Sequence, residues 1–166
     1  MHNGIHTDKP VETLAIAASG DEVRRACEWL TTALRQRDVP DPQVECLELA
    51  LHEVLANVLA HGGSAARAEP IRIRIEVREK ATTGEARVKV RDAGIPFDPT
   101  GAPEHTPAKT LAEARPGGWG LPLIRRCSDW MSYRREDGRN HFMFGARWPK
   151  TLKLPPAYAS RAARRS

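Results

Sequence analysis

The stretch from residue 42 to residue 62 constrains the fold most, because its pattern fits one long helix with three distinct faces. At about 100° per residue, side chains three and four positions apart share one side of a helix. One arc is apolar and suits a core: Leu47, Leu51, Val54, Leu55 and Val58. A second arc combines small residues with a carboxylate, an amide and an imidazole: Cys46, Ala50, Glu53, Asn57 and His61. The remaining arc faces water: Glu45, Glu48 and His52.

Glu53 and Asn57 stand one helical turn apart, so their side chains lie one above the other. An amide oxygen can ligate a hard cation such as Mg²⁺, which proteins hold with one or two side chains and substrate phosphates. A carboxylate one turn away can accept a proton from an attacking hydroxyl. The alternative is a polar stripe on a half-exposed helix, and the helix by itself favours that alternative.

The charge of the chain is unevenly distributed along the sequence. The 166 residues suffice for one domain with a core, and their net charge is +5. Five basic residues and no acidic residue follow position 149: Lys150, Lys153, Arg161, Arg164 and Arg165. Subtracting these five leaves residues 1–149 neutral, so a basic nucleic-acid-binding face on the domain is not indicated, and we expect a solvated basic tail at 149–166. Contact of this tail with nucleic acid or an acidic partner is the alternative.

Cysteine usage and the lack of long apolar runs indicate the cellular compartment in which the protein is expected. Cys27, Cys46 and Cys127 form no CxxC motif, which excludes zinc fingers and thioredoxin-like chemistry, and each falls in a predicted helix. Such cysteines are typical of a reduced protein. No uncharged apolar run is long enough to span a membrane, and the first residues lack a signal-peptide pattern. We therefore expect a cytoplasmic protein without membrane contact.

The predicted elements alternate in a way that suits an α/β fold. Residues 1–10 should be flexible, and either Ser19 or Asp21 should cap the first helix, which runs to about residue 37. Asp41 should cap the long helix, with Pro42 in its first turn. The other elements are a strand at 11–18, a linker at 64–69, strands at 71–78 and 86–91 joined by a turn at 81–85, a lid loop at about 97–117, a helix at about 120–127, and strands at 130–135 and 140–148. This order predicts one domain at 11–148, a two-layer sandwich with helices on one face of a mixed or antiparallel sheet.

Two further motifs flank the predicted lid. Asp92 ends a strand and could accept a hydrogen bond from an exocyclic amine, and Gly94 permits a close backbone approach. An ordinary turn is the alternative for this pair. Gly117, Gly118 and Gly120 precede a helix and could expose backbone amides to an anion, or form a hinge. The GxxxxGK[ST] loop is absent, and the spacing of the glycines does not fit the Rossmann fingerprint.

Together, the motifs resemble a known superfamily. Glu-xxx-Asn on a helix, Asp-x-Gly after a strand, a loop and GGxG before a helix resemble the GHKL ATPases, over roughly residues 10–148. More narrowly, ELALHEVLANVLAHG, VRDAGIPFDP and GGWGLPLIRRCSDWMSYRREDGRN are similar to the bacterial anti-sigma factor serine kinases. The resemblance implies a Bergerat-type fold that holds ATP between the helix layer and the lid.

The resemblance also implies roles for single residues. Glu53 would be the general base, Asn57 would ligate Mg²⁺, Asp92 would bind the adenine amino group, and Gly94 would shape the adenine pocket. The phosphates would lie against the glycine turn and its neighbours: Arg115, Gly117, Gly118, Gly120 and Leu121. Arg115 is about one position out of register, and His61 would lie at the edge of the site.

Three departures from the family pattern stand out. Pro122 lies within the helix that follows the glycines, and the lid lacks a clear phosphate-binding set. The final strand has no obvious threonine beside Asp92, although some relatives have one.

The implied function is partner switching. A chain of this length has no room for the transducer domain of gyrase-like enzymes, and only one helix precedes the long one, unlike in sensor kinases. We expect a serine kinase that uses ATP and Mg²⁺ to phosphorylate a STAS-type anti-sigma factor antagonist and sequesters a sigma factor or another effector. A PP2C-type phosphatase would reverse the mark, and a homodimer is possible. An ATP-dependent binding protein without kinase activity is the alternative, and no direct nucleic-acid partner is expected.

Overall fold

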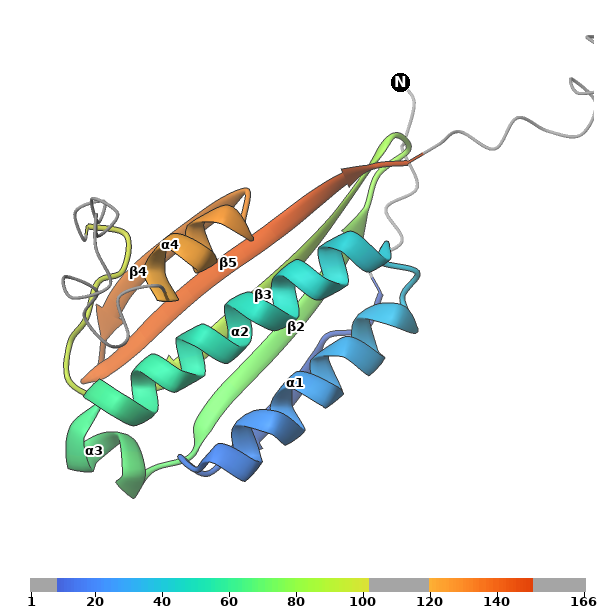
Figure 1. Ribbon diagram of the computed structural model, residues 1–166. Coiled ribbons are helices and arrows are strands. Elements are labelled where there is room, and N and C mark those ends of the chain that lie inside the picture. The colour runs from blue at the N-terminus through green and yellow to red at the C-terminus, as the bar shows by residue number, and fades with distance from the viewer. Residues whose placement is uncertain (1–8, 102–119, 151–166) are drawn as a thin grey trace, which may run out of the picture.

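The computed structural model describes residues 9–101 and 120–150, which form two layers (Figure 1). The elements in chain order are β1 (Glu12–Ile16), α1 (Gly20–Arg35), α2 (Asp41–His61), α3 (Gly63–Ala68), β2 (Ile71–Glu79), β3 (Thr83–Asp92), α4 (Gly120–Arg126), β4 (Trp130–Glu136) and β5 (Arg139–Pro149). Most of the expected flexible N-terminus, lid loop and basic tail lies outside the described residues, so these boundaries stay predictions. None of the described helices has the length and apolar character needed to cross a bilayer.

The strands form one antiparallel sheet in the order β1-β2-β3-β5-β4. The helices cover one face, and α2 lies between α1 and α4 (Figure 1). The predicted hairpin of β2 and β3 is confirmed, and its register pairs Arg72 with Arg91 and Glu79 with Gly84. The expected two-layer sandwich is therefore confirmed, with an antiparallel rather than a mixed sheet.

The core lies between the sheet and the helices. The apolar side chains of β2 alternate with charged ones, so that every second residue is buried: Ile71, Ile73, Ile75 and Val77. The apolar arc predicted for α2 packs on them with Leu47, Leu51 and Leu55 all fully buried. Because full burial of each such side chain contributes about 1.5–3 kcal/mol, this contact holds α2 in one rotational setting.

The N-termini of α1 and α2 decide between the two capping residues expected for α1 and contradict the one expected for α2. Ser19 caps α1, since its side chain accepts a hydrogen bond from the Glu22 amide at 3.4 Å. The prediction that Asp41 caps α2 was wrong, because Pro40 precedes the helix and makes no side-chain cap. Asp41 is the first helical residue, and its carboxylate instead lies 3.3 Å from Arg35 Nε.

Two predicted loops are regular structure. The expected linker at 64–69 is mostly the short helix α3, which alanine favours and which buries Ala66. Gly63 makes the turn between the helices with a φ of 72°. The expected turn at 81–85 is shorter, because β3 already begins at Thr83. Gly84 lies inside that strand, where the buried ring of Trp148 covers it.

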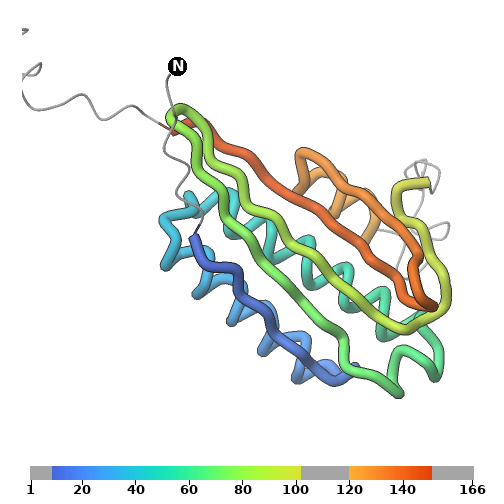
Figure 2. The backbone as a smooth tube through the Cα atoms, turned by 180° about the vertical axis from the view of Figure 1, so that it is seen from behind, coloured from blue at the N-terminus to red at the C-terminus, as the bar shows by residue number. Residues whose placement is uncertain are grey.

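The described helices do not cover the other face of the sheet (Figure 2). This face is strongly basic. Its strands carry eight arginines and one lysine: Arg72, Arg74, Arg78, Arg87, Lys89, Arg91, Arg134, Arg139 and Arg147. The same face carries three glutamates: Glu76, Glu85 and Glu136. The charge count along the chain gave no sign of this face, because alternation along the strands sorts the charges to one side of the sheet.

The contact of Gly84 with Trp148 predicts a stability effect. A Cβ atom on Gly84 would lie 2.1 Å from Trp148 Cε2, and this ring is only 6% exposed. Gly84→Ala should lower the free energy of unfolding by about 1–3 kcal/mol, as overpacking does, measured by urea denaturation. Gly20→Ala is the matched control, because a Cβ atom there meets nothing within 4 Å. Equal stability of the two variants would contradict this packing.

Candidate functional site

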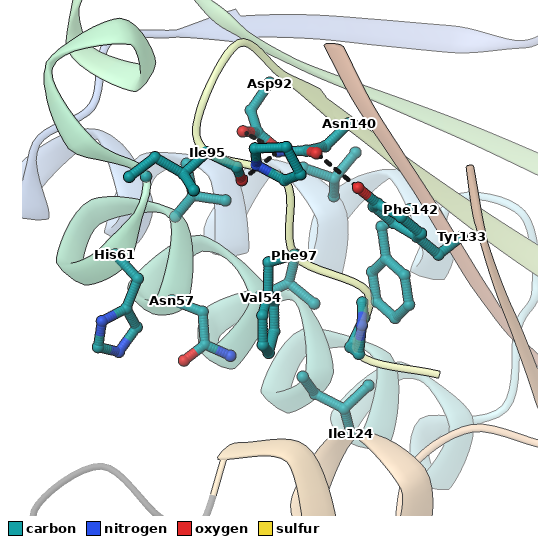
Figure 3. Close-up of a pocket in the computed structure, with 15 residues that line it drawn as sticks. Val54, Asn57, His61, Asp92, Ile95, Phe97, Ile124, Tyr133, Asn140 and Phe142 are labelled. Atoms are coloured by element: carbon teal, nitrogen blue, oxygen red, sulfur yellow. Dashed lines mark hydrogen bonds between the residues drawn. The ribbon is translucent and has the colours of Figure 1, made fainter. Parts of the chain in front are cut away.

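A cavity of about 160 Å³ opens between α2, the segment after β3, α4 and the two C-terminal strands (Figure 3). Its lining is mainly apolar and includes Val54, Val58, Val90, Ile124 and Phe142. Few polar groups reach it: Asn57 and His61 from α2, and Asp92, Tyr133 and Asn140 from the sheet. A concave apolar site with a few convergent polar groups is typical of small-molecule binding.

The Asp92 carboxylate is the buried acceptor of this cavity, with 6% of the residue exposed. Its Oδ1 accepts hydrogen bonds from the Gly94 amide at 2.8 Å and from Asn140 Nδ2 at 2.9 Å. Among the described residues, none donates to its Oδ2. Because Oδ2 is not among the buried atoms without a partner, it is open enough to receive a hydrogen bond from a ligand in the cavity.

Asn140 holds Asp92 in place, and our sequence analysis missed it. Its Nδ2 also donates to the Ile95 carbonyl at 3.1 Å, and its Oδ1 accepts from Tyr133 Oη and Arg135 Nη1, both at 2.8 Å. Arg135 donates to the Gly94 carbonyl as well, at 2.9 Å. Because Nδ2 of Asn140 faces hydrogen-bond acceptors and Oδ1 faces donors, the orientation of the amide is fixed. The signal was the pairing of the last hairpin with β3, which places Asn140 opposite Asp92.

The corner after β3 docks on the C-terminal end of α2. The Ile95 amide donates to the Gly62 carbonyl at 3.0 Å, and a Cβ atom on Gly94 would lie 2.9 Å from Gly62 Cα. Gly94 thus permits a close backbone approach, as predicted, but the partner seen here is Gly62. Ile95 and Phe97 line the cavity while 60% and 48% exposed, so they offer apolar surface to a ligand.

Glu53, Asn57 and Gly120 come together, as the sequence predicted. A Cβ atom on Gly120 would lie 2.9 Å from Glu53 Oε2 and 3.5 Å from Asn57 Nδ2. Asn57 lines the cavity, whereas Glu53 lies beside it and faces α4. His52 Nδ1 lies 3.5 Å from the other oxygen of Glu53, Oε1, a contact that the assignment of His52 to the solvent arc did not predict.

The remaining predicted site residues fall in three groups. His61 lies at the cavity edge and is exposed, as expected. Leu121 packs against the core and does not line the cavity. Arg115, Gly117 and Gly118 lie outside the described residues. Pro122 is accommodated in the first turn of α4, where a missing amide hydrogen costs no helical hydrogen bond.

A family comparison agrees with this geometry. The model of the histidine kinase-like ATPase domain matches residues 16–144 of the chain. The chain belongs to the histidine kinase-like ATPase domain family. This ATPase domain is 33% identical over 131 residues to the serine/threonine-protein kinase BtrW of Bordetella bronchiseptica, a match that covers 78% of this chain and 89% of that protein.

A solved structure shares the fold of this ATPase domain. The crystal structure of the RsbU and RsbW domains of Rv1364c from Mycobacterium tuberculosis matches with a TM-score of 0.62 and 15% sequence identity. The match covers 89% of this chain but 35% of the solved one, so this ATPase domain spans about a third of that protein.

The described residues fit the ATP that this family binds. The free Oδ2 of Asp92 suits the amino group of adenine, and the apolar walls suit a planar ring. The final strand has no threonine beside Asp92, but its Asn140 lies opposite Asp92 and donates a hydrogen bond to it. Asp92 therefore has a hydrogen-bond donor even though the final strand lacks a threonine beside it.

The hydrogen bonds of Asn140 predict a binding defect. Asn140→Ala leaves Asp92 Oδ1 with the Gly94 amide as its donor and frees the carboxylate to rotate. We expect ATP to bind about tenfold more weakly, the effect of one hydrogen bond, as measured by calorimetry. Tyr133→Phe is the control, because Arg135 still donates to Asn140 Oδ1 and ATP affinity should change less than about threefold. Wild-type affinity in Asn140→Ala would contradict this role.

Proposed function

We propose that the protein is an ATP-dependent protein serine kinase of a partner-switching system. One observation carries the proposal: Glu53 and Asn57 lie together against Gly120, beside the cavity that also contains the Asp92 carboxylate. Figure 3 shows Asn57 and Asp92 in this cavity. The site thus has separate groups for a base, a metal-bound phosphate chain and a purine. The likeness to BtrW, a serine/threonine-protein kinase, supports the same reading.

Each group has one task in this proposal. Asp92 Oδ2 accepts from the adenine amino group, while Asn140 keeps the carboxylate oriented. Asn57 offers its amide oxygen to Mg²⁺, which when bound neutralises charge on the phosphates. Glu53 accepts the proton of the attacking serine hydroxyl. His52 lies beside Oε1 of Glu53, and Oε2 faces Gly120, where the phosphates are expected.

The protein substrate in this proposal is a small STAS-type anti-sigma factor antagonist. Phosphorylation of its serine adds close to two negative charges, which weakens an interface built for a neutral hydroxyl. Release of the antagonist would free the kinase to bind a sigma factor or another effector, and a PP2C-type phosphatase would reset the cycle. A homodimer would suit the simultaneous capture of an effector, and the cytoplasm is the expected compartment.

An ATP-dependent binding protein without kinase activity remains the alternative function. It requires the cavity and Asp92, but it has no use for a carboxylate at position 53. The position of Glu53 against Gly120 and next to Asn57 favours the kinase. The two functions are separated by a substitution that removes the base and leaves the cavity unchanged.

Glu53→Gln tests the base. The variant keeps the size of the side chain but cannot accept the proton, so transfer of labelled phosphate from ATP to a purified antagonist should fall about 10²–10⁴-fold. Affinity for ATP should stay within about threefold, because Glu53 does not line the cavity. Glu45→Gln is the matched control, an exposed glutamate on the same helix that should transfer at the wild-type rate. Unchanged transfer in Glu53→Gln would mean that another group is the base, and no transfer by the wild type would support the binding protein.

Asp92→Asn tests purine recognition. The Gly94 amide and Asn140 hold an acceptor at Oδ1, so the new NH₂ group takes the place of Oδ2 and becomes a donor to the cavity. The wild type should prefer ATP over inosine triphosphate, which carries a 6-oxo group, and the variant should lose or reverse this preference by about tenfold.

The control for this exchange is Asp137→Asn, an exposed turn position with a φ of 51° that asparagine tolerates. It should keep the preference of the wild type. An unaltered preference in Asp92→Asn would place the purine elsewhere.

A further inference from the structure

The uncovered face of the sheet carries a second feature, distinct from the ATP cavity. Side chains alternate along β3, so that Val90 and Asp92 face the cavity while Lys89 and Arg91 face the opposite side. A ligand on the uncovered face therefore leaves the cavity accessible. Figure 2 shows this face with the strands in front of the described helices.

Four of its side chains stand in one row across four strands. Arg72 of β2 lies opposite Arg91 of β3, Arg91 opposite His141 of β5, and His141 opposite Arg134 of β4. Lys89 lies two residues from Arg91 on the same strand. We call these five residues the basic patch. Like charges opposite each other destabilise a sheet, so the fold alone gives no reason for this arrangement.

Much of the patch lacks counter-charges. At the other end of the face, Glu76 lies within ion-pair distance of two arginines, and so does Glu85. Within the described ranges, no carboxylate lies that close to Arg72, Lys89 or Arg91. Arg134 is the arginine of the patch that has a carboxylate within ion-pair distance among the described residues, Glu136 at 3.1 Å.

His141 adds an unpartnered group at the centre of the row. It is 9% exposed, and its Nδ1 is buried without a hydrogen-bond partner, as is Arg91 Nε. Burial and the neighbouring Lys89, Arg134 and Arg91 hold the pKa of His141 below its ordinary value, while Glu136 opposes this shift. At one end of the row, Arg72 and Arg91 also line a hollow of about 40 Å³, whose other lining residues include Glu69, Asp92 and Arg139.

We propose that the basic patch is a docking surface for an acidic helix of a partner protein. Neighbouring strands are about 4.8 Å apart, and glutamates at positions i and i+4 of a helix are about 5–6 Å apart. A helix laid across the strands therefore brings one carboxylate to each cation of the row. The proposal concerns the far side of the sheet from the ATP cavity and does not depend on the proposed kinase activity.

Charge and composition distinguish this occupant from a nucleic acid. Sheet faces that bind single strands offer aromatic rings on which bases stack. On the described part of this face, the rings belong to Trp130, which lies under the Arg87 guanidinium and donates to Glu85, and to His141, which is only 9% exposed. The patch thus offers charge without stacking, as suits carboxylates.

The test uses the full chain and a labelled helical peptide with glutamates at i and i+4 on an alanine background. Fluorescence anisotropy at low salt should show binding that weakens at least tenfold in the double variant Lys89→Glu/Arg91→Glu. This variant should fold, because the new glutamates lie opposite Arg72 and Arg74. Arg72→Gln/Arg134→Gln, at two exposed positions, provides a second variant that should also bind more weakly.

Three controls sharpen the test. Arg24→Glu/Arg25→Glu reverses two exposed charges on α1 and should leave peptide binding within twofold of wild type. The same peptide with a central proline should bind more weakly. The pKa of His141, followed by NMR, should rise when the peptide binds, because nearby carboxylates favour the charged imidazole.

Several results would overturn the proposal. Wild-type affinity for the peptide in both patch variants would show that the peptide binds elsewhere. Tighter binding of an oligonucleotide of the same charge would make nucleic acid the occupant. Self-association in sedimentation that is lost in Lys89→Glu/Arg91→Glu would make the face an interface between two copies of this chain.

Discussion

The burial of α2 against the sheet is the contact on which the rest of the structure depends. Leu47, Leu51 and Leu55 are fully buried, and this fixes the rotation of the helix. Once that rotation is set, Glu53 and Asn57 must face α4, and the C-terminal end of the helix must meet the corner after β3. The apolar arc of α2 thus sets the positions of Glu53 and Asn57, which lie on another arc of the same helix.

The second constraint is polar and runs across three strands. Tyr133 and Arg135 of β4 bind Asn140 of β5, and Asn140 binds Asp92 of β3. The network keeps one carboxylate oxygen engaged and directs the other toward the cavity. A buried carboxylate without such partners would rotate or take up a proton. The end of the cavity at Asp92 is therefore a property of the sheet, and the end at Asn57 a property of the helices.

Sequence reasoning succeeded where the signal was local and periodic. The alternation in β2 and β3 and the faces of α2 each lie within one element, so these segments were predicted with the correct type and orientation. Sequence reasoning failed where a segment distant in the chain determines the local structure. Gly84 was predicted in a turn, but it lies in a strand under the ring of Trp148. Asp41 was predicted to cap α2, but its carboxylate lies beside Arg35.

The amino-acid sequence by itself indicated most of the elements and the family, and it singled out Glu53, Asn57 and Asp92 as candidate site residues, because each rests on spacing within a short stretch. The tertiary structure alone decided that Asn140 holds Asp92 and that Gly62 receives the corner after β3, since these contacts join residues 48 and 33 positions apart. It also decided that a chain neutral up to residue 149 has one basic face. Strand pairing places side chains on a common surface, and a linear count contains no information about strand order.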